Sequence, residues 1–273
     1  MNHADKPENE ASSSIIEIRD LEMSYGGFVV MQGLNFTVNR GDIFIIMGVS
    51  GSGKSTLLKH LVGLKRPARG KVLYDGVSYW EAEAELQQRL KRRFGILFQS
   101  GALWSSLTLG ENVALPLEQY TGLNPSQVRE LVSFKLALVG LAGFEDFYPA
   151  EVSGGMMKRA GLARAMALDP DILFFDEPSA GLDPVSARLL DDLILELGQC
   201  QGITVVVVTH ELASIFAIGT NSVFLDPDQK AITASGAPKT ILKESADQKV
   251  LSFLTRGERG QEHGKPCSCW GTR

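Results

Sequence analysis

The feature that most constrains this 273-residue sequence is a glycine-rich segment at residues 48–56, with the letters GVSGSGKST. It follows an apolar, strand-like run at residues 43–47 and leads into a helical pattern at residues 57–64. Glycines allow the backbone to wrap closely, so that successive N–H groups and the start of the next helix face an anion. The segment therefore predicts a loop that binds the phosphates of a nucleoside triphosphate.

Two side chains of this loop are expected to have separate tasks. We expect Lys54 to reach the β- and γ-phosphate oxygens and Ser55 to ligate Mg²⁺. The alternative, a glycine-rich turn that merely ends a strand, does not explain a Lys-Ser pair between a strand and a helix. The loop residues expected to surround the nucleotide are Gly48, Ser50, Gly51, Gly53, Lys54, Ser55 and Thr56.

A pair of neighbouring carboxylates supplies the second part of the expected chemistry. An apolar run delivers Asp176 and Glu177 to the end of a buried strand, which Pro178 closes. We expect Asp176 to hold Mg²⁺ through water, while Glu177 faces the γ-phosphate and polarises the attacking water. An acidic strand end that only caps a helix is the alternative. The upstream phosphate-binding loop favours the catalytic interpretation.

Apolar periodicity predicts one composite α/β domain. Residues 15–21 and 28–38 are typical of strands and form a β-rich flank at the start of the chain. Residues 101–167 are mostly helical in pattern, which predicts a helical insertion. Buried strands at residues 172–175 and 204–208, separated by a helix, then give the βαβ order of a mostly parallel sheet.

Charge and hydropathy exclude several classes of protein. The net charge of -5 is opposite in sign to that of a typical phosphate-backbone binder, so nucleic acid is not an expected partner. No apolar run approaches the roughly 18 to 20 residues needed to cross a bilayer. Residues 1–14 lack the apolar core of a secretory signal and the cysteine count is odd, so we expect a cytosolic protein. His263, Cys267 and Cys269 suggest a metal site, but this tail-like segment offers no fourth ligand and we expect no metal there.

A third segment, VSGGM at residues 152–156, precedes the acidic strand and resembles the signature loop of ABC transporter nucleotide-binding subunits. Ser153, Gly154 and Gly155 stand before a helical pattern, where a hydroxyl, bare N–H groups and a helix N-terminus form a second anion site. The family resemblance implies a head-to-tail homodimer. Each ATP would lie between the phosphate-binding loop of one subunit and the signature loop of the other.

The same resemblance implies the fold and the organisation of the chain. It implies a P-loop NTPase (RecA-like) core with a mostly parallel sheet, an N-terminal antiparallel β flank and an inserted α-helical subdomain. The implied division is a polar tail at residues 1–14, an ATPase domain at residues 15–245 and a partly disordered C-terminal extension at residues 246–273. Within this extension, a short amphipathic piece at residues 250–254 precedes a Gly-rich polar end that has no evident core to join. We expect the piece to form a locally packed short helix, and docking on a neighbouring protein is the alternative.

Four further positions match the order of functional residues in the family. Gln99 resembles the loop glutamine that touches Mg²⁺ and senses the transport subunit, and His210 resembles the switch histidine at the γ-phosphate. With Glu177 they form the expected catalytic set. Tyr25 resembles the aromatic residue that stacks on adenine, and Asp183 resembles an aspartate at the subunit interface. Taken alone, a strand-end histidine or a single tyrosine is more often structural.

Two departures from the common signature are informative. Val152 replaces the usual Leu, and Met156 replaces a Gln, which removes a side-chain amide at the head of the signature helix. The phrase SGGM followed by KRAGLARA at residues 158–165 resembles the ATPase of Mla-type lipid transporters, as do residues 98–104 and 111–117. Those transporters work with MCE-domain proteins.

This closer resemblance implies a place in the cell envelope of a diderm bacterium. The chain would energise phospholipid transport from the cytoplasmic face of the inner membrane. Its implied partners are an integral membrane permease dimer, an MCE-domain protein and a small accessory subunit. ATP and Mg²⁺ are the implied cofactors.

The ATPase subunit of another class of ABC transporter is one alternative to the lipid transporter. Two other classes of ATP-binding protein also remain as alternatives. A soluble mechanical ATPase acting on DNA or ribosomes also uses signature loops, but it commonly has two ATPase units, a long coiled coil or a basic arm. The sequence carries none of these. A P-loop kinase would use the helical insertion as a lid, and residues 153–155 would then have no explanation.

Overall fold

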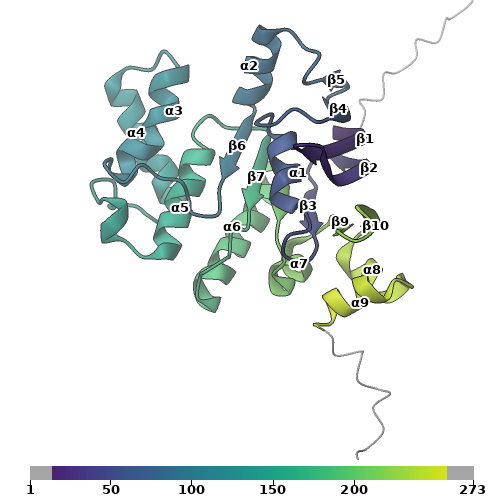
Figure 1. Cartoon of the computed structure of the whole chain (residues 1–273). Helices are drawn as coiled ribbons and strands as arrows, with labels where there is room; N and C mark the ends of the chain where they lie inside the picture. The colour runs from purple at the N-terminus through teal and green to yellow at the C-terminus, as the bar shows by residue number, and fades with distance from the viewer. Residues whose placement is uncertain (1–13, 257–273) are drawn as a thin grey trace, which may run out of the picture.

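The computed structural model describes residues 14–256, and their strands form two sheets (Figure 1). One is antiparallel, with the order β2-β1-β4-β5. The other has the order β10-β9-β3-β8-β7-β6 and is parallel except that β10 runs antiparallel to β9. The strands are β1 Ser14–Tyr25, β2 Phe28–Asn39, β3 Ile43–Met47, β4 Arg69–Tyr74, β5 Val77–Ser78, β6 Phe94–Leu97, β7 Ile172–Asp176, β8 Thr204–Val208, β9 Asn221–Asp226 and β10 Ala231–Gly236.

The parallel strands of this second sheet are separated in sequence by helices, whereas β10 follows β9 directly. No helix among residues 14–256 is long and apolar enough to cross a membrane. The helices are α1 Lys54–Leu61, α2 Ala84–Arg92, α3 Leu109–Tyr120, α4 Pro125–Leu138, α5 Gly154–Ala165, α6 Pro184–Gln201, α7 Leu212–Ile218, α8 Pro238–Glu244 and α9 Gln248–Leu254, with a 3₁₀ turn at Pro149–Glu151.

The central strands β3, β7 and β8 are covered on both faces, as their continuous apolar sequences require. One face packs against α1 and the antiparallel sheet, through residues such as Phe44 and Ile46. The opposite face packs against α5, α6 and α7, through residues such as Ile43 and Ile45. The expected parallel sheet with its antiparallel flank is therefore present, and β3 and β8 have the bounds that the apolar runs predict.

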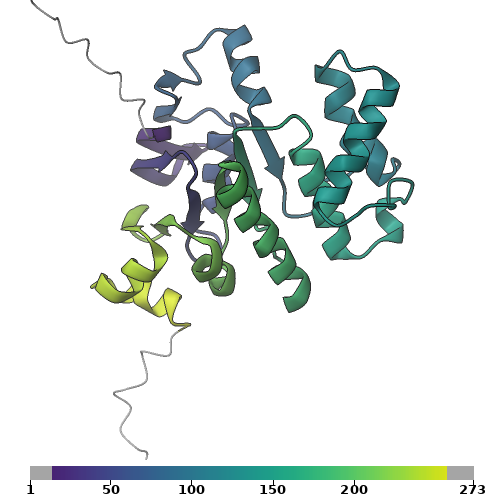
Figure 2. The ribbon, with the colours of Figure 1, turned by 180° about the vertical axis from the view of Figure 1, so that it is seen from behind.

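The insertion expected at residues 101–167 contains α3, α4 and α5. Figures 1 and 2 show α3 and α4 on the opposite side of the molecule from β1 and β2. Thr108 and Asn124 begin α3 and α4 with reciprocal capping boxes, which explains where these helices start. Helix α5 differs from the other two because it also packs against β6 of the parallel sheet. It therefore joins the insertion to the core.

The amphipathic piece at residues 250–254 is part of a short helix, α9, that packs on the core, which is the local packing expected for it. Val250 and Leu254 of α9 are buried in the same cluster as Phe224 of β9. The rings of Phe253 and Phe224 meet edge to face, with centroids 5.2 Å apart. The periodicity did not predict β9, and β9 supplies the apolar surface that α9 covers.

An ion pair also fastens α9 to the end of β9. The cation is Lys249, whose Nζ lies 3.1 Å from Asp226 Oδ2 and 2.6 Å from Asp228 Oδ2. Asp226 is only 1% exposed, so its charge requires this compensation. His263, Cys267 and Cys269, for which no metal is expected, lie outside the described residues, as does most of the polar tail.

Candidate functional site

The expected site residues follow three neighbouring strands at the same edge of the parallel sheet. Gly48 follows β3, Glu177 follows β7 and His210 lies two residues beyond β8. The register pairs Ile46 with Val208 and Val208 with Asp176, so these strand ends are level. Parallel α/β sheets bind ligands at the carboxyl ends of their strands. The strand order thus brings together residues that lie far apart in the sequence.

Glycine is required at two points of the phosphate-binding loop. A Cβ on Gly48 would stand 2.7 Å from the Leu225 carbonyl oxygen, so no side chain fits there. Gly53 has a φ of 90° and begins α1 without a side-chain cap. The N–H groups at the start of α1 therefore have no capping side chain and can face an anion.

Lys54 is the buried cation of this loop. Its side chain is 6% exposed, and Nζ donates to the carbonyl oxygens of Gly48 at 2.9 Å and Val49 at 3.1 Å. Nζ also lies 3.8 Å from Glu177 Oε1. Burial lowers the pKa of Lys54, and the Glu177 and Asp176 carboxylates oppose that change. Lys54 thus connects the loop to the acidic strand end.

Ser55 and Asp176 form the oxygen pair expected to hold Mg²⁺. The Ser55 hydroxyl donates to Asp176 Oδ1 at 2.7 Å. Burial raises the pKa of Asp176, while the hydrogen bond from Ser55 acts against it. A hydroxyl and a carboxylate are the hard oxygen ligands that Mg²⁺ prefers, so the donor set fits this ion. Gln99 lies exposed in the turn after β6, and none of the described contacts joins it to this pair.

Glu177 has the geometry of an oriented carboxylate. Its backbone has a φ of 48°, and its N–H donates to the Val208 carbonyl at 2.8 Å. Oε1 lies 2.9 Å from His210 Nδ1, whereas Oε2 is buried without a hydrogen-bond partner. Glu177 is 8% exposed. One oxygen is thus fixed by His210, and the other is left to a water or ligand.

The signature loop begins α5. Ser153 is its N-cap, and the Ser153 hydroxyl accepts from the Met156 N–H at 3.2 Å. The cap uses a lone pair of this hydroxyl and not its proton, which can still be donated to an anion. A Cβ on Gly155 would lie 2.9 Å from Ser186 Oγ, so α5 approaches the start of α6 closely. None of the described contacts joins residues 153–155 to the phosphate-binding loop of the same chain.

Tyr25 and Asp183 have local partners in addition to their expected roles. Tyr25 is 48% exposed, and Lys65 Nζ lies 2.7 Å from its ring centroid. A hydrogen bond with Thr56 lowers the pKa of Tyr25. Asp183 is the N-cap of α6 and accepts from the N–H groups of residues 185 and 186 and from the Ser186 hydroxyl. Stacking on adenine and an interface contact remain predictions for these two residues.

Sequence reasoning missed one residue next to the site, Lys158 of α5. It is 6% exposed and donates to three carbonyl oxygens of residues 177–180. The spacing of Gly155, Lys158 and Leu162 at i, i+3 and i+7 places Lys158 on the buried face of a helix. A lysine at such a position signals a specific partner, because an isolated buried charge is costly.

Comparison with known proteins identifies the family. The sequence model of the ABC transporter family matches residues 31–180. The intermembrane phospholipid transport ATP-binding protein MlaF of Haemophilus influenzae is 39% identical over 247 residues, which cover 90% of this chain and 92% of MlaF. MlaF of Escherichia coli K12 is 37% identical over 90% of both chains.

A further relative is longer than this chain. The probable ribonucleotide transport ATP-binding protein mkl of Mycobacterium tuberculosis is 40% identical over 239 residues, or 88% of this chain. The match spans only 66% of mkl, so about a third of that protein has no counterpart in the comparison.

Solved structures of ATP-binding cassettes have the same architecture. The cassette MJ0796, in a dimeric post-hydrolysis state bound to ADP and Pi, has a TM-score of 0.74 and 28% identity over 81% of this chain and 97% of its own. The cbiO1 protein of Clostridium perfringens has a TM-score of 0.77 and 25% identity over 91% of this chain and 97% of its own. These likenesses confirm the predicted P-loop NTPase fold. With the family match, they confirm the predicted relationship: the chain belongs to the ABC transporter family.

Proposed function

We propose that this chain is the ATP-hydrolysing subunit of an ABC transporter that moves phospholipid across the bacterial envelope through a separate permease. The observation that supports hydrolysis most strongly is the convergence of Lys54, the Ser55–Asp176 pair and the Glu177–His210 pair at one sheet edge. The near full-length similarity to MlaF supports phospholipid as the cargo.

The proposed chemistry assigns one task to each group. Lys54 and the N–H groups that begin α1 bind the β- and γ-phosphates. Ser55 and Asp176 would hold Mg²⁺, which when bound would neutralise charge on the phosphates. Glu177 orients and polarises the attacking water, and His210 fixes the Glu177 carboxylate. Gln99 completes the metal site, and Tyr25 stacks on the adenine.

The proposed assembly is a homodimer with two ATP sites at its interface. Each site combines the phosphate-binding loop of one subunit with Ser153, Gly154 and Gly155 of the other, while Asp183 lies at the interface. The exposed Ser153, which has no described contact with its own phosphate-binding loop, supports this arrangement. The dimeric state of the similar MJ0796 cassette supports it as well.

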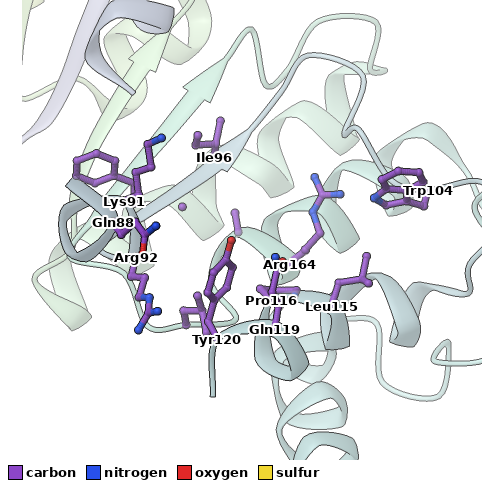
Figure 3. A pocket seen from close by; sticks show the side chains of 14 residues that line it. Gln88, Lys91, Arg92, Ile96, Trp104, Leu115, Pro116, Gln119, Tyr120 and Arg164 are labelled. Carbon is purple, nitrogen blue, oxygen red and sulfur yellow. The ribbon is translucent and has the colours of Figure 1, made fainter. Parts of the chain in front are cut away.

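A groove on the surface is suited to the permease. A cavity of about 700 Å³ lies between α2 and β6 of the core and α3 and α5 of the insertion (Figure 3). Trp104 is 62% exposed and Tyr120 45% exposed at this groove. Exposed aromatic side chains in a concave surface are typical anchors of protein interfaces. A permease bound in this groove would contact both the insertion and the core. A movement of the insertion relative to the core would therefore be transmitted to the permease.

The remaining partners follow from the lipid-transport proposal. They are an MCE-domain protein and a small accessory subunit. The chain would be bound to the cytoplasmic face of the inner membrane by the permease. A mechanical ATPase acting on nucleic acid is less well supported, because the net charge is -5.

Co-purification tests the proposed function directly. The full chain, extracted from membranes in mild detergent, is expected to carry an integral membrane permease together with bound phospholipid. The name of mkl raises ribonucleotide as a second cargo, and nucleotide in place of lipid in the permease would support that interpretation. Recovery with nucleic acid instead, with release by salt, would rule out the transporter.

Replacement of Lys54 by Ala should weaken ATP binding by about 10- to 100-fold, because a hydrogen-bonded charge of this kind contributes about 1.5 to 3 kcal/mol. Titration with a fluorescent ATP analogue measures the change. Lys71→Ala, which removes an exposed lysine paired with Glu81, is the control and should bind ATP normally. Equal affinity in the two variants would remove Lys54 from the nucleotide site.

Replacement of Trp104 by Ala tests the groove. Loss of an aromatic anchor typically costs about 2 kcal/mol or more, so permease affinity should fall by roughly 30-fold. ATPase activity of the isolated subunit should not change, because Trp104 lies at the groove and not at the sheet edge. Phe134→Ala, which removes an exposed aromatic of α4 outside the groove, should retain the permease. Retention of the permease by both variants would place its docking surface elsewhere.

A further inference from the structure

Lys158 connects the signature helix to the backbone beside Glu177. Its Nζ donates to the carbonyl oxygens of Pro178 at 2.6 Å, Ala180 at 2.8 Å and Glu177 at 3.3 Å. A lysine ammonium has three N–H donors, and these three acceptors satisfy all of them. Every acceptor belongs to the short segment that begins with Glu177.

The three carbonyl groups are the main partners of the buried Lys158 ammonium. Lys158 is 6% exposed, and no carboxylate forms an ion pair with it among the described residues. Burial lowers the pKa of Lys158, while attraction to the Glu177 charge opposes the change. The three carbonyl bonds therefore provide most of the local compensation for a buried cation. If the segment moved relative to α5, this cation would lose its partners.

Lys158 connects two groups, Ser153 and Glu177, that would act on different ATP molecules in the proposed dimer. Ser153 begins α5 only five residues before Lys158, a rise of about 7.5 Å along one rigid helix. At the other end, Glu177 holds a φ of 48° and is fixed by Val208 and His210. In the dimer, Ser153 would meet the ATP bound by the partner, while Glu177 would act on the ATP of its own subunit.

We propose that Lys158 is a positioning residue that makes hydrolysis by Glu177 depend on engagement of the signature loop of the same subunit with the partner's ATP. When Ser153 binds the phosphates of the partner's ATP, α5 is displaced and the Lys158 ammonium moves with it. The carbonyl groups that are bonded to Lys158 then move the segment that begins with Glu177. The two ATP sites are thereby coupled through a single side chain. This inference rests on the proposed ATP-bridged homodimer.

Lys158→Met tests the coupling, because Met has a similar length without donors. We expect kcat to fall by about 10- to 100-fold, since small misplacements of catalytic groups have effects of this size. The ATP concentration giving half-maximal rate should change by less than about threefold, because Lys158 does not bind the nucleotide. If the two sites are coupled as proposed, the unaltered chain should respond to ATP with a Hill coefficient above 1, and Lys158→Met should lower this coefficient to about 1. Lys158→Arg, which restores donors, should recover much of the rate and the cooperativity.

Arg159→Met is the matched control on the same helix. Arg159 donates to the Val139 and Gly140 carbonyl oxygens inside the insertion, so its loss disturbs α5 without touching the segment of Glu177. A similar fall in kcat for both variants, or retained cooperativity in Lys158→Met, would overturn the proposal. If Lys158→Met does not fold, Lys158→Arg is compared with Lys158→Gln instead. A Lys158→Gln chain with the full rate and full cooperativity would also overturn the proposal.

The dimer on which the proposal rests is tested separately. A Glu177→Gln chain should form a dimer with ATP, seen as a shift in size-exclusion elution. The double variant Glu177→Gln, Lys158→Met should form the same dimer. If this dimer forms but Lys158→Met behaves as the control, only the coupling is wrong. If no dimer forms in either chain, the proposed assembly itself fails and the coupling fails with it.

Discussion

Replacing Glu177 with Gln is expected to lower ATP turnover by about 10²- to 10⁴-fold while ATP binding persists, because loss of a general base has effects of this size. Gln has nearly the same shape and can still bond to His210, but its neutral amide polarises water poorly. The structure makes this expectation specific: Oε1 is bonded to His210 Nδ1 and the buried Oε2 has no partner. Phosphate release under saturating ATP gives the turnover.

The matched control for this variant is Glu211→Gln. Glu211 Oε1 lies 3.9 Å from the other ring nitrogen of His210, so the control removes a neighbouring carboxylate without altering the Glu177 contact. Its turnover should stay within about threefold of the unaltered chain. Glu177→Gln should also accumulate as a closed dimer with ATP, since closure precedes hydrolysis. Unchanged turnover in Glu177→Gln would remove Glu177 from the catalytic role.

Ser153→Arg is expected to abolish most turnover, by about 100-fold or more, because a long side chain at the head of α5 prevents close approach of a phosphate. The affinity of a single subunit for ATP should not change, since Ser153 would act on the partner's nucleotide. Loss of the Ser153 cap also costs about 1 kcal/mol of stability, which is too little to explain such a loss of activity by unfolding. Turnover, ATP affinity and dimer formation are measured on the same preparation.

Ser126→Arg provides the comparison for this second variant. Ser126 is exposed in the first turn of α4, so the control adds the same side chain at a similar helix position away from the signature loop. It should hydrolyse ATP normally. Normal hydrolysis by Ser153→Arg as well would contradict the ATP-bridged dimer. Met156→Gln is a milder probe of the same loop, because Met156 keeps its backbone bond to Ser153.

The parts of the fold that local pattern determines were predictable from sequence. The continuous apolar runs of β3 and β8 give the strand bounds directly, because strands buried on both faces need no alternation. Strand β9 was not predictable in this way. Ser222 and Asp226 are buried within it, and their polarity hides the strand. Their partners come from distant residues, as when Lys249 pairs with Asp226.

The candidate site shows a similar division. The residue types and spacing of the phosphate-binding loop predict its ligand, because the local backbone and side chains form most of the anion site. The approach of His210 to Glu177 was predictable only through the family order, since these residues are 33 positions apart. Lys158 was missed because its three acceptors lie on another segment, and a helix pattern shows burial but not the partner.

The packing of α9 on β9 changes what counts as the smallest fragment able to fold. A chain shortened to residue 245 would keep every expected ATP-binding residue, yet it would uncover Phe224 and leave Asp226 buried without its cation. Truncation at this point should yield an aggregation-prone product whose low activity reflects poor folding and not poor chemistry. Limited proteolysis of the intact chain should accordingly spare the peptide bonds of α9, Gln248–Leu254.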